Sequence, residues 1–67
     1  MELNTYSIMI YRFDIYEFRK LFPYAIFNDI ISEGKYAHFY LENCNIVSAH
    51  LKCQKIGLIL LETTLIL

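Results

Sequence analysis

The segment at residues 35–42 alternates between two kinds of side chain, and this alternation constrains the fold more than any other feature of the sequence. One set is apolar and the other is rich in tyrosine: Ala37, Phe39 and Leu41, against Tyr36, His38 and Tyr40. Successive side chains of a β-strand point to opposite faces of the sheet. The pattern therefore predicts a strand with one face in a core and the other exposed, as in an antiparallel sheet covered on one side.

A second strand is predicted over residues 5–12, which are β-branched and aromatic. Its two faces carry Tyr6, Ile8 and Ile10 on one side and Ser7, Met9 and Tyr11 on the other. The first of these sets is suited to the core of the same sheet.

Residues 46–53 alternate again, which favours a third strand. The intervening residues 43–45 read Asn-Cys-Asn, a sequence typical of a hairpin turn because asparagine tolerates positive φ. The register of this hairpin places apolar residues opposite one another on the core face and His38 opposite His50 on the exposed face. Two histidines that face each other predict a hairpin that weakens below about pH 6, because like charges repel across a strand pair.

A helical layer is predicted between the first two strands. Asp14 and Glu17 have the spacing of a capping box at a helix start. Apolar residues follow at helical spacing: Ile15, Phe18, Leu21 and Phe22, then Ile26, Phe27, Ile30 and Ile31. Pro23 either kinks this helix or begins a second one. Gly34 is the residue expected to end it.

Residues 56–67 carry apolar side chains at both odd and even positions. Such a run is typical of a strand that is buried on both faces. A helix is the alternative, but Gly57, Thr63 and Thr64 weaken it. One helical layer covers one face of a small sheet, so this strand predicts that something else covers the second face.

Together these segments predict a single small α+β domain over residues 1–67. The sheet is expected to be mostly antiparallel with three to four strands, in the order βαβββ, and to carry one helical layer.

The apolar content of the chain exceeds what a core of this size can hold. Of the 67 residues 57% are hydrophobic, with a mean hydropathy of +0.36. A domain this short buries only about 60% of the surface that its unfolded chain exposes. We therefore expect a partner, either another protein or a second copy of the chain, to cover part of the surface.

Charge and targeting signals narrow the function classes further. The formal net charge is −1, which lacks the strong basicity of proteins that bind phosphate backbones. The first residues have neither the basic nor the apolar region of a signal peptide, and no apolar stretch reaches the roughly 20 residues of a membrane span. We expect an intracellular, cytoplasmic setting. The excess of residues with AT-rich codons predicts an AT-rich source genome.

The residues that carry chemistry form no recognisable catalytic or metal motif. Cys44 and Cys53 are too few for a disulfide framework. In the predicted hairpin neither thiol lies beside His38 and His50, so these histidines lack a third metal ligand. Gly34 and the single other glycine provide no phosphate-binding loop. We expect no cofactor, no metal and no enzymatic activity.

The function that these patterns favour is a non-catalytic protein-interaction module, such as a small subunit, inhibitor or adaptor. It would dock through the Tyr-rich sheet face or through its C-terminal strand. The predicted interface residues are Met9, Tyr11, Tyr36, His38, Tyr40, His50, Ile59 and Leu61. The alternative is a component of a ribonucleoprotein that binds nucleic acid through the Tyr, His and Lys side chains of that face, including Lys52.

Overall fold

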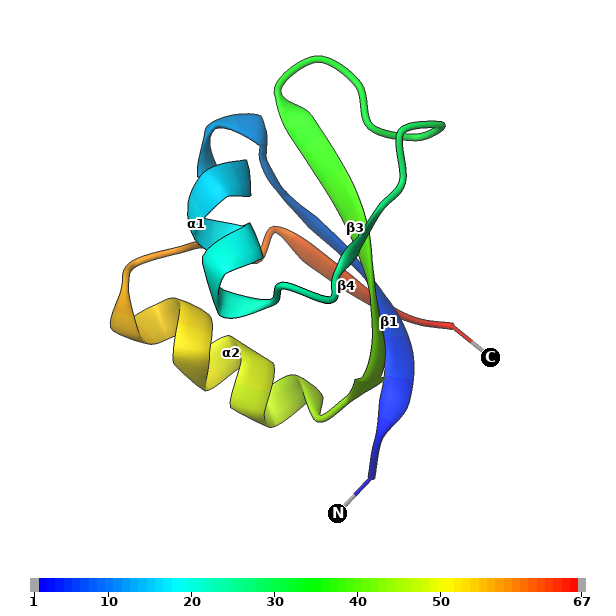
Figure 1. The fold of residues 1–67 in the computed structure, drawn as a ribbon, viewed down its shortest axis with the longest axis vertical. Coiled ribbons are helices and arrows are strands. Elements are labelled where there is room, and N and C mark those ends of the chain that lie inside the picture. The colour runs from blue at the N-terminus through cyan, green and yellow to red at the C-terminus, as the bar shows by residue number, and fades with distance from the viewer. Residues whose placement is uncertain (1, 67) are drawn as a thin grey trace.

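The computed structural model describes residues 2–66, which fold into one antiparallel sheet with two α-helices (Figure 1). The elements are β1 (Asn4–Tyr11), the 3-10 turn η1 (Arg12–Asp14), α1 (Ile15–Leu21), β2 (Ile26–Phe27), β3 (Tyr36–Cys44), α2 (Ile46–Lys55) and β4 (Glu62–Ile66). The predicted α+β class is confirmed, and the observed order roughly matches the predicted βαβββ. Within the described residues no helix is long and apolar enough to cross a membrane.

The four strands lie in the order β2-β3-β1-β4, and every neighbouring pair is antiparallel. In the centre of the sheet Ile8 of β1 is opposite Phe39 of β3 on one side and Thr63 of β4 on the other. The two strands predicted over residues 5–12 and 35–42 are therefore confirmed. They pair with each other.

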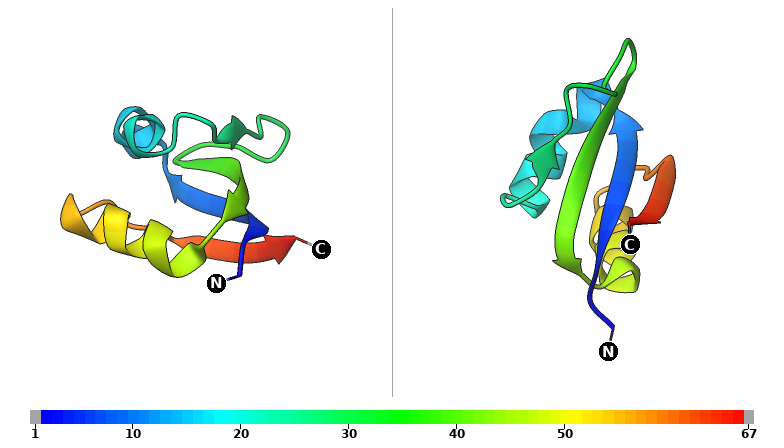
Figure 2. Two further views of the ribbon diagram at one scale, coloured as in Figure 1. Left: turned by 60° about the horizontal axis from the view of Figure 1, so that its bottom comes forward. Right: turned by 90° about the vertical axis from the view of Figure 1, so that its right-hand side faces the viewer.

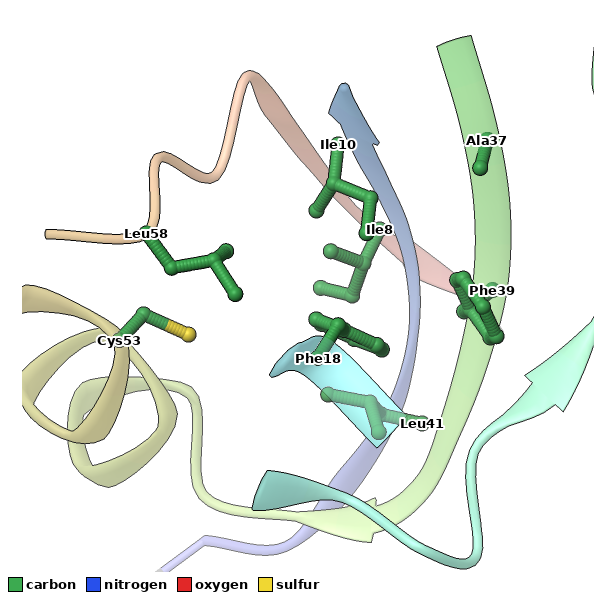
Figure 3. Close-up of a cluster of buried hydrophobic side chains, with 8 residues drawn as sticks. All are labelled: Ile8, Ile10, Phe18, Ala37, Phe39, Leu41, Cys53 and Leu58. Atoms are coloured by element: carbon green, nitrogen blue, oxygen red, sulfur yellow. The ribbon is translucent and has the colours of Figure 1, made fainter. Parts of the chain in front are cut away.

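Both helices lie on the same side of the sheet, with α1 toward β3 and α2 toward β4 (Figure 2). The predicted single helical layer is confirmed, although two separate helices form it. The core fills the space between this layer and the sheet (Figure 3). Its cluster of buried residues is Ile8, Ile10, Phe18, Ala37, Phe39, Leu41, Cys53 and Leu58.

Aromatic rings connect α1 to the sheet. The ring centroid of Phe18 lies 4.7 Å from that of Phe39 and 4.9 Å from that of Phe22. Phe27 of β2 meets the Phe39 ring edge-on at 5.4 Å. Because Phe18 and Phe39 are fully buried, truncating either to alanine should cost about 3–5 kcal/mol.

The prediction of a third strand over residues 46–53 is wrong, because this segment is α2. The Asn45 side chain accepts a hydrogen bond from the Ser48 backbone N–H at 2.9 Å, which caps the helix N-terminus. Asn45 therefore begins a helix instead of closing a hairpin. The expected pairing of His38 with His50 does not form, and the predicted weakening below pH 6 loses its basis.

The helical prediction is correct for α1 but wrong beyond it. The helix ends at Leu21, and Phe22 has φ −130° and ψ 73°, outside the α region. Pro23 explains this end, because a proline ring disfavours the α conformation in the residue before it. Asp14 occupies the N-cap position of α1, but its side chain caps no N–H of the described helix, so the predicted capping box is absent.

The chain between Pro23 and β3 forms the short strand β2 and a polar loop. The Asn28 N–H donates to the His38 carbonyl at 2.9 Å, and the His38 N–H donates to Ser32 Oγ at 2.9 Å. Ser32 Oγ in turn donates to the Asn28 carbonyl at 2.6 Å. These bonds hold the loop along the edge of β3. Gly34, with φ +60°, lies in the turn before β3 and does not end a helix.

The prediction of a strand over residues 56–67 is confirmed only for Glu62–Ile66, and the expectation that it is buried on both faces is wrong; Leu67 lies outside the described residues. Gly57 has φ +72° and ends α2 in a Schellman motif: its N–H donates to the Gln54 carbonyl, and the Leu58 N–H donates to the Cys53 carbonyl. This motif turns Leu58 into the core beside Cys53. β4 begins only at Glu62, lies at the sheet edge and is largely exposed.

Candidate interaction surface

The face of the sheet that points away from the helices is referred to below as the open face. The strand register assigns it alternate residues of each strand: Thr5, Ser7, Met9 and Tyr11 of β1, Tyr36, His38 and Tyr40 of β3, Glu62, Thr64 and Ile66 of β4, and Ile26 of β2. In the right-hand view of Figure 2 the strands stand in front and both helices lie behind them. No helix of the described chain covers this face.

Three aromatic rings form a row at one end of the open face. The Tyr11 ring stacks on Phe13 at a centroid distance of 5.2 Å with an interplanar angle of 6°, and on Tyr36 at 6.1 Å with 28°. Phe13, in the 3-10 turn after β1, is 81% exposed. Phe13, Tyr11 and Tyr36 are called the aromatic row below.

Arg12 fixes the backbone under the aromatic row. Its Nε donates to the Gly34 carbonyl at 2.8 Å and its Nη2 to the Tyr36 carbonyl at 3.2 Å. Its backbone N–H donates to the Lys35 carbonyl at 2.6 Å. The Arg12 side chain thus links the end of β1 to the turn before β3. These bonds hold in place the backbone that carries the three rings.

The middle of the open face is half-buried and mixes apolar and polar side chains. Met9 lies opposite His38, and Ile26 lies opposite Tyr40. The Tyr40 hydroxyl accepts a hydrogen bond from Asn28 Nδ2 at 3.0 Å, so its position depends on the loop beside β3. This part of the surface offers contact area together with a few fixed hydrogen-bonding groups.

The structure brings together five of the eight predicted interface residues: Met9, Tyr11, Tyr36, His38 and Tyr40 share the open face. The other three lie elsewhere. His50 is exposed on α2, in the helical layer. Ile59 and Leu61 lie in the segment between α2 and β4, where the Leu61 N–H donates to the Met9 carbonyl at 2.9 Å.

Sequence reasoning missed three apolar contributors to this surface. Phe13 continues the alternation of Met9 and Tyr11 by two residues, and that spacing was the signal for it. The helical prediction places Ile26 on the inward side of a helix, and the C-terminal prediction places Ile66 in a strand buried on both faces. Neither element forms as predicted, so both residues lie on the open face instead.

The open face carries few charged side chains. Glu62 lies on it with His38, while Arg12 and Lys35 stand at the end that carries the aromatic row. Lys52, which the nucleic-acid alternative requires on this face, belongs to α2, and its Nζ lies 5.8 Å from the Phe22 ring centroid. His50, also expected on this face, belongs to α2 as well. The basic character expected for nucleic-acid binding is therefore reduced.

A separate cleft of about 380 Å³ lies between the C-terminus of α1 and the N-terminus of α2. Cys44 lines it, and burial raises the pKa of its thiol above its ordinary value, with Lys52 opposing this change. Burial also raises the pKa of Cys53, and the nearby Cys44 adds to the effect. Both cysteines are free, and a thiol with a raised pKa is a poor nucleophile at neutral pH. Within residues 2–66 no three His, Cys, Asp or Glu residues are grouped so that they could hold a metal ion.

Comparisons with known proteins add no family or relative to this description: no family model, no curated protein and no solved structure matches the chain. The arrangement of the described residues is therefore the basis for any functional inference.

Proposed function

We propose that this chain is a non-catalytic protein-interaction module, such as a small subunit, inhibitor or adaptor, that binds its partner on the open face. The observation that supports the proposal is the contrast between the two faces of one sheet. The helices cover one face, whereas the other presents the aromatic row, Met9 and Tyr40 without a covering element in the described chain.

The composition of the open face suits a protein partner. Tyrosine, phenylalanine and methionine are enriched at protein interfaces, and Lys and Glu are depleted there. Large rings supply contact area at a low entropic cost, since few torsion angles must be fixed on binding. Stacking within the aromatic row and the Arg12 hydrogen bonds reduce this cost further, because the rings are partly ordered beforehand.

The competing proposal is a nucleic-acid partner stacked on the aromatic row. The rings and the adjacent Arg12 and Lys35 favour it, because bases stack on aromatic side chains beside cations. The Glu62 carboxylate on the open face and the net charge of −1 disfavour it, because a phosphate backbone would be repelled by them. The proposal of a protein partner is therefore better supported than that of a nucleic-acid partner.

Site-specific photo-crosslinking tests the proposal. A photoreactive phenylalanine analogue replaces Tyr36 in one variant and Tyr24 in a matched control, and each protein is irradiated in a lysate of the source cell. Tyr24 is 93% exposed but lines the cleft between the helices, away from the open face. We expect a discrete crosslinked protein from position 36 and not from position 24.

A second variant tests whether the same contact has energetic weight. Tyr36→Asp places a charge in the aromatic row, and we expect it to weaken binding of the crosslinked protein at least tenfold, while Tyr24→Asp leaves binding unchanged. Circular dichroism checks that both variants remain folded. Crosslinks to nucleic acid at position 36, with binding that falls steeply as salt rises, would support the competing proposal. Equal crosslinking from both positions would contradict both.

A further inference from the structure

The two edges of the sheet differ in how their backbone groups are satisfied. Beyond β2, the edge of β3 is closed by the polar loop: Asn28 and Ser32 bond both backbone groups of His38, and Glu33 forms a bridge with Tyr36. β4 pairs with β1 on one side, and no hydrogen bond from the described residues reaches its other side. One edge consists of a two-residue strand and a bonded loop, whereas the other is open along a five-residue strand.

β4 also lacks the features that usually protect an open edge. Natural edge strands carry lysine, proline or a bulge that prevents pairing with another strand. β4 reads Glu-Thr-Thr-Leu-Ile, its register with β1 is continuous, and its one charge lies at its first residue. Leu65 and Ile66 are 47% and 41% exposed. This strand is regular, apolar at one end and available for pairing.

We infer that two copies of the chain associate by antiparallel pairing of β4 with β4 about a two-fold axis at Thr64. Thr64 is the middle residue of the strand, so this register pairs all five residues. It places Thr64 opposite Thr64, Thr63 opposite Leu65, and Glu62 opposite Ile66. Threonine pairs across antiparallel strands are favourable.

Charge and geometry support a second copy as the occupant of this edge. The two Glu62 side chains would lie four residues apart along the strand, about 13 Å. This exceeds the screening length of about 8–10 Å at ordinary ionic strength. The net charge of −1 gives little overall repulsion between copies. The inferred pairing therefore brings no like charges into contact.

The closed edge of β3 limits the size of the assembly. A two-fold contact uses the same surface of each copy, so the β4 edge is consumed once two chains have paired. At the far edge of each copy β2 has only two residues, and the loop at residues 28–33 bonds to β3, so little backbone is left there for pairing. The product is a dimer with a continuous antiparallel sheet, not a fibre. Side-chain alternation continues across the new strand pair, so the two open faces join into one surface.

Substitution of Thr64 by residues of opposite charge tests this inference. Native mass spectrometry of the untagged wild-type protein should show a dimer whose share rises from low to high micromolar concentration. Thr64→Lys and Thr64→Glu each place like charges opposite each other, and each variant alone should be monomeric. An equimolar mixture of the two should restore a dimer that contains one chain of each kind. Gln54→Lys and Gln54→Glu on the exposed side of α2 are matched controls and should dimerise like the wild type.

The outcomes separate this inference from the proposed function. A wild-type protein that stays monomeric at all concentrations would overturn the β4 pairing, as would dimerisation of Thr64→Lys alone. Neither result involves a foreign partner, so neither bears on binding at the open face. Conversely, failure of the position-36 crosslink would leave the dimer inference intact.

Discussion

Among single residues, the two cysteines show how burial changes the ionisation of a side chain. Cys53 is 1% exposed in the core between α2 and Leu58, whereas Cys44 lies at the cleft and is half-buried. Burial disfavours the thiolate, so both thiols hold their protons more tightly in the folded chain than in the unfolded one. Cys53 is therefore a small core residue whose ionisation is linked to folding.

We predict that the free energy of unfolding falls at alkaline pH in part because of Cys53. A thiol whose folded pKa is raised stabilises the folded state below its unfolded pKa, about 8.5, and this contribution is lost as pH rises toward the folded pKa. Urea denaturation at about pH 8 and about pH 10 measures the effect. Cys53→Ala should show a smaller loss between these two values than the wild type. The wild type and the variant share every other ionisable group, so an identical loss in both would refute the assignment.

The face on which each residue of β1 and β3 lies could be predicted, because side chains alternate along a strand with a period of two. Met9 and His38 appear on the open face as predicted, and Ile8 and Phe39 appear in the core. The position of Ile26 could not be predicted in this way. It depends on where α1 ends, and the conformation that Pro23 imposes on Phe22 determines that end.

At the scale of elements, α2 shows why residues 46–53 could not be assigned from periodicity alone. Apolar residues at positions 47, 49, 51 and 53 alternate as in a strand, while Ala49 and Cys53 also have helical spacing. The helix buries Ala49 and Cys53 and leaves Val47 and Leu51 66% and 54% exposed. Two signals did favour the helix: Asn45 at its start and Gly57 beyond its end. The sequence prediction instead assigns Asn45 to a hairpin turn and Gly57 to the C-terminal strand.

We predict that these two end residues stabilise α2 by similar amounts. Asn45→Ala removes the side-chain cap and should cost about 1 kcal/mol of stability. Gly57→Ala should cost about 1–2 kcal/mol, because alanine is strained at positive φ. An added Cβ at Gly57 meets no atom within 4 Å, so this cost is conformational and not steric. Chemical denaturation of both variants, with Gln54→Ala as the control, measures it. Losses no larger than that of the control would contradict the assigned roles.

At the scale of the whole molecule, a short chain with a high apolar content leaves much of its apolar surface outside the core. One sheet face packs against two helices, and the other face and the β4 edge remain open. Exposed apolar side chains also occur on the helical layer, including Val47 and Leu51 of α2. The predicted excess of apolar surface is therefore real, but it is spread over several regions and not concentrated at one doubly buried strand.

Concentration-dependent stability follows if part of this surface is covered by a second copy. Binding that occurs only in the folded state stabilises it by mass action, by about 2.7 kcal/mol when the free partner is a hundredfold above Kd. For a domain of this size a gain of about 1 kcal/mol per chain raises Tm by roughly 4–8 °C. We predict a rise of this order for the wild type between low and high micromolar protein in differential scanning calorimetry. Thr64→Lys should melt at the same temperature at both concentrations, because its paired lysines prevent association through β4. A wild-type Tm that does not change with concentration would show that the β4 edge does not contribute to stability through self-association.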